Sequence, residues 1–249
     1  MKVFLSGLES SEKNIIDEYI KKGKKVDYCL TSYYYLRKKE TLKEKIFLFA
    51  NEILVDSGAH SFQKGKKVDW VEYTKQYAEF IKEFDRPNVV GYFEMDVDNI
   101  IGYNKVLELR KILENVSDKI IPVWHKNRGI EEYKKMCKDY KGKVIAITGF
   151  RNEDIKDDQY LMFLKYAKKF NCKVHCLGMT RKKVLDKVPF DYVDSSSWKQ
   201  AGNFGEYRQF KNNKINIYNK KGKYKTEELD KMNFQEFVNM QKYYKMKWK

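Results

Sequence analysis

The stretch ILVDSGAHSF, residues 53–62, indicates how the chain folds. Three apolar residues run into Asp56, and a Ser-Gly turn follows, which is typical of a buried strand that ends at the acid. Burial on both faces favours a strand of a parallel sheet. Because α/β folds bind ligands at the carboxyl ends of such strands, we expect Asp56 at the mouth of a site. The alternative is that Asp56 caps a following helix.

Similar apolar segments recur along the chain, and a helical pattern follows most of them. The expected strands span residues 2–8, 26–31, 53–56, 88–95, 120–124, 144–148, 173–177 and 192–194. The expected helices span 10–21, with Ser10 or Ser11 as cap, then 32–49, 69–84, 101–113, 131–140, 159–170 and 180–185. Eight alternating units predict a closed (β/α)8 TIM-type barrel. An open doubly wound sheet is the alternative, although no GxGxxG or GxxxxGK[ST] motif is present.

Size and charge restrict the class of protein. The chain has 249 residues, 42% of them hydrophobic, enough for one barrel or two small domains. Its formal charge of +16 favours a polyanionic partner such as nucleic acid, although an excess of Lys can also be a compositional habit. There is no apolar run of membrane-spanning length and no signal peptide, so a soluble cytoplasmic protein is expected, in the host cytoplasm if it is viral.

The four cysteines are scattered and form no CxxC pair. Neither a disulfide framework nor a zinc knuckle is therefore indicated, and we expect no metal and no cofactor. Cys172, His175 and Cys176 lie close together in one expected strand, where packing is a better interpretation than metal ligation.

The last 51 residues differ from the rest in composition, because they are more basic. We therefore expect a barrel domain over 1–198 and a basic, aromatic-rich extension over 199–249 that packs on the barrel. The extension holds 13 Lys and Arg against 5 Asp and Glu, a net of +8 out of the total of +16. Aromatic residues interleave with the lysines, a combination that suits base stacking beside phosphate contacts. We expect residues 203–225 to contact a polyanion. The alternative for 226–247 is an amphipathic helix that closes the barrel and exposes a solvated lysine face.

Candidate catalytic and substrate-binding residues lie at the ends of the expected strands. They are Asp56, Asp96 with Asp98, His125, Gly149, Gly178 with Met179, and Asp194. Two acids that face one another across a barrel mouth suit cleavage of a glycosidic bond, in which one carboxylate attacks the sugar and the other handles a proton. The barrel makes such a pairing of Asp56 and Asp194 possible, because parallel strands open onto the same face.

Five segments resemble motifs of the tRNA-guanine transglycosylases. DSGAHSFQ at 56–63 resembles the family's DSGGFQ or DSGSFQ motif, and FDYVDSSSW at 190–198 is similar to its second acid motif at the eighth strand. FEMDVD at 93–98, AITGF at 146–150 and HCLGM at 175–179 resemble three further motifs. The five matches occur in the family's order, each at an expected strand end.

This resemblance implies a base exchange. Asp194 would be the nucleophile that attacks C1′ of a guanosine nucleotide, and Asp56 would be the general acid and base. Asp191, three residues earlier, is the alternative match for the nucleophile. Asp96, or Asp98 if the register differs, would accept hydrogen bonds from the base. The remaining residues of the implied base pocket are Ser57, Gly58, His125, Gly149, which would offer backbone groups, and Met179, which would pack on the base.

The sequence departs from the family in ways that bear on the choice between tRNA and DNA as the substrate. The chain lacks the CxCxxC…H zinc site and the added RNA-binding domains, and it has VWH where the tRNA enzymes have VQG. It therefore resembles the zinc-free DNA transglycosylases of phages and bacterial islands, which insert a 7-deazaguanine base such as preQ0. Alternatives are a tRNA-guanine transglycosylase without zinc and a non-catalytic nucleic-acid-binding barrel. We expect Lys199, Arg208, Lys211 and Lys214 to contact the nucleic-acid backbone.

Overall fold

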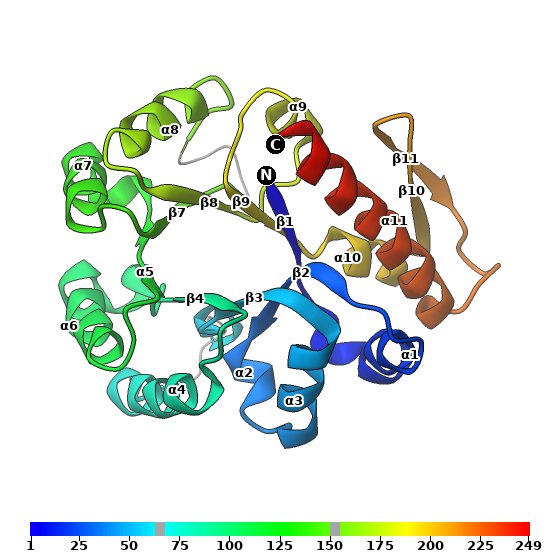
Figure 1. The fold of residues 1–249 in the computed structure, drawn as a ribbon, viewed down its shortest axis with the longest axis horizontal. Helices are drawn as coiled ribbons and strands as arrows, with labels where there is room; N and C mark the ends of the chain where they lie inside the picture. Colours follow the sequence, from blue (N-terminus) through cyan, green and yellow to red (C-terminus); the bar gives the residue numbers. More distant parts are fainter. Residues whose placement is uncertain (63–67, 150–154) are drawn as a thin grey trace.

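The computed structural model describes residues 1–62, 68–149 and 155–249. Within them, nine parallel strands in the order β5-β4-β3-β2-β1-β9-β8-β7-β6 form a nearly closed barrel inside a layer of helices (Figure 1). The strands are β1 (Lys2–Leu5), β2 (Val26–Ser32), β3 (Ala50–Asp56), β4 (Val89–Phe93), β5 (Ile120–Ile121), β6 (Val123–Trp124), β7 (Val144–Thr148), β8 (Lys173–Leu177) and β9 (Tyr192–Ser195). The predicted TIM-type barrel is confirmed.

The fifth expected strand is divided in two by Pro122. Proline has no N–H to donate to a ladder, so β5 and β6 stand on either side of it. β5 pairs with β4 and β6 pairs with β7, and the Pro122 carbonyl accepts from the amide of Ala146 at 2.8 Å. One short segment therefore joins the two ends of the sheet, and nine strands occupy eight barrel positions.

Helices follow the strands and cover the outside of the barrel. They are α1 (Asp17–Lys21), α2 (Tyr33–Leu36), α3 (Glu40–Phe49), α4 (Trp70–Phe84), α5 (Asp98–Ile101), α6 (Tyr103–Glu114), α7 (Ile130–Asp139), α8 (Tyr160–Lys168) and α9 (Lys182–Leu185). Asp69 caps α4, because its carboxylate accepts from the amides of Val71 and Glu72 at 3.1 and 3.0 Å. The expected first helix is instead a 3₁₀ turn (Leu8–Ser10), a π turn (Glu12–Ile16) and α1, and no serine side chain caps it.

The strand side chains form two separate cores. One lies inside the barrel and contains Phe4, Tyr28, Leu30, Leu54, Phe93, Ile121, Val123, Ala146 and Tyr192. The other lies between the strands and the helices. Because side chains alternate along a strand, a residue two positions beyond an interior one continues the inward-facing row. Asp56 stands in this relation to Leu54, as does Asp194 to Tyr192.

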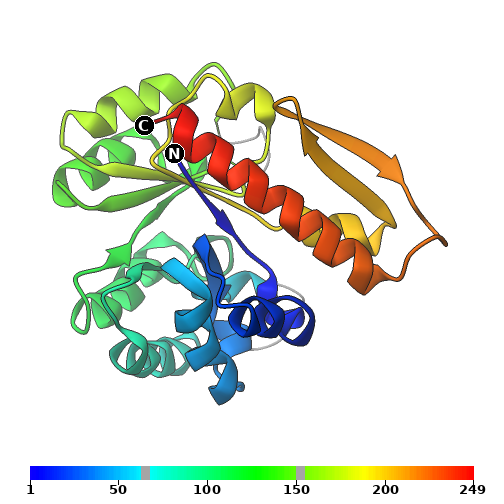
Figure 2. The same cartoon turned by 45° about the vertical axis from the view of Figure 1, so that its right-hand side comes forward.

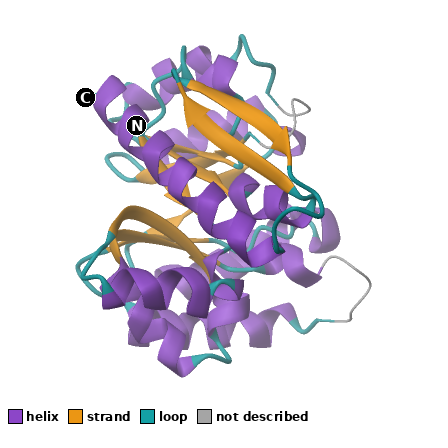
Figure 3. Cartoon of the chain, turned by 90° about the vertical axis from the view of Figure 1, so that its right-hand side faces the viewer, coloured by secondary structure: helices purple, strands orange, loops and turns teal. Residues whose placement is uncertain are grey.

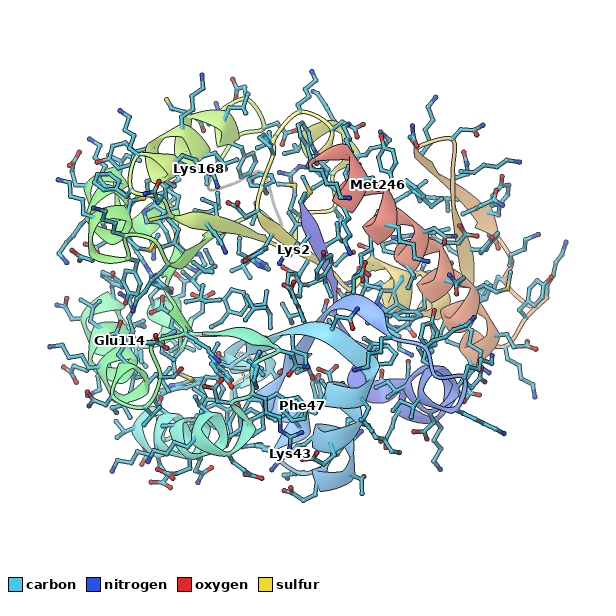
Figure 4. All side chains as sticks on the ribbon, in the orientation of Figure 1. Lys2, Lys43, Phe47, Glu114, Lys168 and Met246 are labelled. Carbon is cyan, nitrogen blue, oxygen red and sulfur yellow. The ribbon has the colours of Figure 1, made fainter. Side chains whose placement is uncertain are left out.

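The amino end of the barrel is closed by an ion pair. Lys2, labelled in the middle of the ring in Figure 4, lies two residues before Phe4, and its ammonium is 2.6 Å from the Glu52 carboxylate. The same ammonium lies 5.5 Å from the ring centres of Tyr28 and Tyr192. A ligand would therefore enter at the opposite, carboxyl end of the strands.

After β9 come α10 (Ser197–Asn203), a hairpin of β10 (Glu206–Lys211) and β11 (Lys214–Asn219), and α11 (Thr226–Lys247). α11 packs beside β1, and the Gln241 side-chain amide donates to the carbonyls of Val3 and Tyr28 at 2.7 and 2.9 Å. The structure therefore agrees with the alternative given for 226–247, a helix that packs against the barrel. The hairpin stands out from the barrel alongside α11 (Figures 2 and 3). None of the helices in the described ranges is long and apolar enough to cross a membrane.

Candidate functional site

Two acids lie at the carboxyl end of the barrel. Asp56 is the last residue of β3, and Asp194 is the third of the four residues of β9. Both continue inward-facing rows, and both are partly exposed. β2 and β1 separate the two strands in the sheet. Parallel strands place their ends on the same face, so the two carboxylates share one mouth.

Asp191, the alternative to Asp194, lies at the other end of β9. Its carboxylate accepts from the Lys168 ammonium at 2.7 Å and from the amide of Val174 at 2.8 Å. Its carbonyl accepts from the amide of Lys2, the residue that closes the amino end of the barrel. Asp191 therefore has a structural environment away from the mouth, and Asp194 is the better candidate for chemistry.

The Asp194 carboxylate is held by two donors on one of its oxygens. Oδ1 lies 2.9 Å from Nε2 of His175 and 2.8 Å from the amide nitrogen of Gly178. No residue in the described ranges donates a hydrogen bond to Oδ2, and 15% of the side chain is exposed. The carboxylate is thus oriented by β8 and the turn after it, with one oxygen available for bond formation.

Tyrosines of α4 hold the chain around Asp56. The Tyr77 hydroxyl lies 3.3 Å from the carbonyls of Val55 and Phe93, and the Tyr73 hydroxyl donates to the Ser57 carbonyl at 2.8 Å. Burial raises the pKa of Tyr77, and the charge of Asp56 raises it further. The strand end that carries Asp56 is therefore braced from outside the barrel.

Ser57 and Gly58, expected in the base pocket, have structural roles here. The Ser57 side chain is fully buried and its carbonyl is occupied by Tyr73. Gly58 has φ +74°, and a Cβ there would lie 2.3 Å from Cβ of Tyr34. Only glycine fits such a position without strain. Both residues set the direction of the turn that follows Asp56.

Asp96 and His125 meet where the fourth and fifth strand positions end. Nε2 of His125 lies 2.6 Å from Oδ1 of Asp96, and a guanidinium nitrogen of Arg128 lies 3.7 Å from the same oxygen. Asp98, the alternative base-binding acid, is bound more tightly, by Arg128 at 3.0 Å and by Asn127 at 3.1 Å. Its side chain is 2% exposed, against 10% for Asp96. Asp96 is therefore the more accessible of the two acids.

Asp96 also raises the pKa of His125. Burial alone would lower the pKa of this imidazole, but its hydrogen bond with Asp96 and the charges of Asp96 and Asp98 outweigh burial. A group with a raised pKa stabilises the fold below its ordinary value of about 6.5, and this stabilisation is lost as the pH rises through the raised pKa. The protonated ring carries a positive charge, and this charge offsets part of the negative charge of Asp96.

A buried ionic network underlies this pair. Glu94 is fully buried and accepts from Arg110 at 2.6 Å, from Arg128 at 3.0 Å and from the amide of Val123 at 2.7 Å. The sequence interpretation did not include Glu94, Arg110 or Arg128. Their partners lie 16 to 34 residues away along the chain, and the packing of neighbouring β/α units brings them together.

Three side chains at this end of the barrel lie close enough together to bind one metal ion. Ligand atoms of Asp96, Asp98 and His125 lie within 4.8 Å of one another. However, Arg128 already lies against both carboxylates, and its guanidinium supplies positive charge there. We therefore propose no metal at this cluster.

Gly149 and Met179, expected in the base pocket, have contacts within the protein. The Gly149 carbonyl accepts from Arg181 at 2.8 Å, and a Cβ on Gly149 would lie 2.5 Å from the Cys176 sulfur. Met179 is 1% exposed and belongs to the outer core. The Gly149 carbonyl is bound to Arg181 and the Met179 thioether is buried in the outer core, so neither group is open to a base in this structure. Gln63 and Phe150, the last residues of two motifs, lie outside the described residues.

Two of the four expected nucleic-acid contacts are occupied within the protein. Lys199 is paired with Asp230, and Arg208 is bound to Glu206 at 2.8 Å and to the Ser197 carbonyl at 3.3 Å. Phosphate contacts by Lys199 and Arg208 stay predictions, and in this structure each cation already has an acid beside it. Lys211 and Lys214 differ, since both are exposed at the hairpin turn with no ion pair in the described part of the chain.

A groove of about 570 Å³ lies between the hairpin, α9 and α11. Its lining residues are Thr180, Lys182, Lys183, Asp186, Ser197, Arg208, Lys214, Ile215, Ile217, Phe237 and Met240. Thr180 and Ser197 come shortly after the ends of β8 and β9, so the groove begins beside the mouth. It combines an apolar floor with a predominantly basic wall.

No protein-family model, curated protein or solved structure matches the chain. The motifs and the side-chain geometry at the mouth therefore carry the functional proposal.

Proposed function

We propose that the chain is a base-exchange transglycosylase that replaces guanine in DNA by a 7-deazaguanine base, with a covalent bond between Asp194 and the sugar as intermediate. One observation carries the proposal. The Asp194 carboxylate lies at the carboxyl end of the barrel with one oxygen held by two donors and the other without a donor among the described residues. Asp56 opens onto the same mouth. An oriented carboxylate nucleophile with a second carboxyl group suits substitution at a glycosidic carbon.

In the first half of the reaction, a lone pair on Oδ2 of Asp194 forms a bond to C1′ as the bond from C1′ to N9 of guanine breaks. The electron pair of that bond goes to N9, and Asp56 in its protonated form donates a proton to the departing base. The products are free guanine and a glycosyl ester on Asp194. The ionised Asp56 that remains is ready to act as a base.

In the second half, Asp56 takes the proton from N9 of the incoming 7-deazaguanine. The N9 lone pair attacks C1′, and the ester bond breaks with its electron pair returning to Asp194. Both carboxyl groups recover their initial protonation states. No oxidant, reductant or activated cofactor is needed, because one N-glycosidic bond is exchanged for another.

Base recognition is assigned to Asp96. Its carboxylate can accept hydrogen bonds from the ring and amino N–H groups that guanine and 7-deazaguanine share. His125 and Arg128 lie against the Oδ1 side of this carboxylate and keep it oriented.

A nucleic-acid substrate is supported by the groove beside the mouth, and the choice of DNA rests on the absence of the zinc motif from the sequence. Enzymes that act on a base in a duplex must flip it out or meet it single-stranded, at a cost of a few kcal/mol. Phosphate contacts offset such a cost. A basic wall with an apolar floor, next to the proposed reaction site, suits the strand that flanks a flipped nucleotide. The 7-deazaguanine base would be the small-molecule substrate.

Exchange of labelled guanine tests the function. The purified protein is incubated with radiolabelled guanine and either duplex DNA, single-stranded DNA or unmodified tRNA. Label is expected in DNA, and unlabelled preQ0 should release it again. Label in tRNA alone would transfer the assignment to a tRNA-guanine transglycosylase without zinc. Tight binding with no exchange into any acceptor would favour a non-catalytic nucleic-acid-binding barrel.

The exposed lysines beside the groove give a second test. Replacing Lys183, Lys211 and Lys214 by glutamine should weaken DNA binding on any sequence. It should also flatten the slope of log K against log salt by roughly 2–3 units, at about 0.9 for each duplex phosphate that the variant no longer neutralises. Binding is measured by fluorescence anisotropy over a salt series.

The charge-matched control replaces Lys82, Lys105 and Lys134, which lie on α4, α6 and α7, away from the hairpin (Figure 1). The control should leave the slope close to that of the wild type. Equal slopes for both triple variants would mean that the hairpin lysines are ordinary solvated surface.

A further inference from the structure

His175 lies in the barrel interior with an unusual combination of contacts. The residue is fully buried, and its Nε2 is 2.9 Å from Oδ1 of Asp194. Its other ring nitrogen, Nδ1, has no hydrogen-bond partner among the described residues. His175 is in register with Tyr192, so it faces the same interior row that leads to Asp194.

These contacts determine which ring nitrogen carries the proton. A neutral imidazole has one N–H and one acceptor nitrogen. Because Asp194 offers an acceptor to Nε2, the proton belongs on Nε2, and Nδ1 is the acceptor without a partner in the described part of the chain. A second proton would place an N–H on Nδ1 with nothing there to receive it, and an unsatisfied buried donor is costly. His175 therefore donates to Asp194 through Nε2.

The surroundings of the ring keep this arrangement in place. The ring packs against Phe93, with centres 5.0 Å apart, and against Phe4 and Tyr192 at 6.3 and 6.4 Å. Close packing by three aromatic rings limits rotation of the imidazole. The donor is therefore presented to Asp194 from a rigid position on β8.

We propose that His175 is a positioning residue that, together with the Gly178 amide, fixes Oδ1 of Asp194 and so selects Oδ2 as the attacking oxygen. The proposal rests on the transglycosylase function given above. In the covalent intermediate, Oδ1 is the carbonyl oxygen of the ester. The same two donors polarise that carbonyl and make the carboxylate a better leaving group when the second base attacks.

The first arm of the test uses nuclear magnetic resonance and needs no activity. The chain has three histidines, so labelling histidine with ¹⁵N gives a simple spectrum, in which His175→Gln identifies the His175 signals. At neutral pH the wild type should show His175 protonated on Nε2 only. Asp194→Ala should move the Nε2 signal, whereas Asp191→Ala, at the other end of β9, should not. A proton on Nδ1, or an Nε2 signal unchanged in Asp194→Ala, would overturn the proposal.

The second arm measures kinetics of base exchange. His175→Phe keeps an aromatic ring in the interior but removes the donor, and His175→Gln keeps a side-chain N–H. We expect His175→Phe to lower kcat roughly 10- to 150-fold, the range for loss of a hydrogen bond to a charged group, with KM for DNA changed about twofold or less. His175→Gln should recover most of the rate. Full kcat in a folded His175→Phe, or equal losses in both variants, would contradict a positioning role.

The two arms separate failure of this proposal from failure of the function. If the wild type exchanges no base into DNA or tRNA, the proposed function is wrong, and the magnetic resonance arm alone decides whether His175 donates to Asp194. If exchange occurs but the His175 signals do not respond to Asp194→Ala, the function stands and the positioning role is wrong. Should His175→Phe fail to fold, His175→Gln and the spectra of the wild type and Asp194→Ala still give an answer.

Discussion

Base exchange is expected to fall by on the order of 10⁴-fold or more in Asp194→Asn, the scale seen when a covalent nucleophile is removed from an enzyme. An amide is a far weaker nucleophile than a carboxylate. The fold should persist, because the amide oxygen of the asparagine still accepts from His175 and from the Gly178 amide. Binding of DNA should change little. The measurements are label exchange, and a protein–DNA adduct on a denaturing gel that the wild type forms and the variant does not.

Asp191→Asn is the matched control for this experiment. It makes the same chemical change beside the same strand, but at the amino end of the barrel, where Asp191 accepts from Lys168 and Val174. The control should retain exchange and adduct formation. An active Asp194→Asn enzyme, or loss of the adduct in Asp191→Asn alone, would remove Asp194 from the proposed mechanism.

The positions of the strand ends could be predicted from the sequence. β7 and β8 match their expected ranges residue for residue. A short apolar run that stops at an acid or a glycine is a local signal, and burial of both strand faces makes it clear. The same signal placed Asp56 and Asp194 at the carboxyl ends of their strands. What it could not give is the partner of each acid, since partners depend on register.

The hairpin from 206 to 219 is not among the expected elements. β10, EYRQFK, lacks the alternation of a half-buried strand, although β11, KINIYN, alternates polar and apolar residues over 214–217. All residues of the hairpin are partly or fully exposed. Its turn did carry a signal, since Asn212 and Asn213 both adopt positive φ, of 52° and 57°. Asparagine tolerates this conformation, which a two-residue turn of type I′ requires. A turn of this type between residues 211 and 214 predicts a hairpin.

Charge counting located the basic region but not its available cations. Lys199 and Arg208 lie in the most basic part of the chain, yet each is paired with an acid of the same region. Lys211 and Lys214 sit at the turn, beyond the reach of such acids among the described residues. Composition reports the sum of the charges, whereas a phosphate contact depends on which cations have no acid beside them.

The buried network below Asp96 gives the largest expected change in stability. Arg128 has a side chain only 1% exposed, and it contacts the carboxylates of Glu94, Asp96 and Asp98. Arg128→Met keeps much of the side-chain length but removes the charge. Loss of one partner from a buried ion pair typically costs about 3–5 kcal/mol, because the remaining charge is buried without compensation. The urea concentration at the midpoint of unfolding should fall. The slope of the unfolding free energy against urea concentration should change little.

Lys82→Met is the control for loss of a lysine or arginine charge, since its ion pair with Glu79 joins side chains that are 53% and 71% exposed. An exposed pair contributes about 0–1 kcal/mol, so this variant should unfold close to the wild type. A loss in Arg128→Met no larger than in Lys82→Met would mean that the network adds nothing to stability.

Asp98→Asn distinguishes a buried charge from lost packing. In the wild type this change removes a partner of Arg128, whose Nε lies 3.0 Å from Oδ2 of Asp98, and it should destabilise the fold. In the Arg128→Met background it removes a carboxylate that no longer has its cation, so it should be neutral or stabilising. The reversal of sign is a coupling between the two sites that a double-mutant cycle measures directly. Additive losses would mean that Arg128 acts through the volume of its side chain, and that the charge of the network has no part in holding the two loops that carry Asp96 and His125.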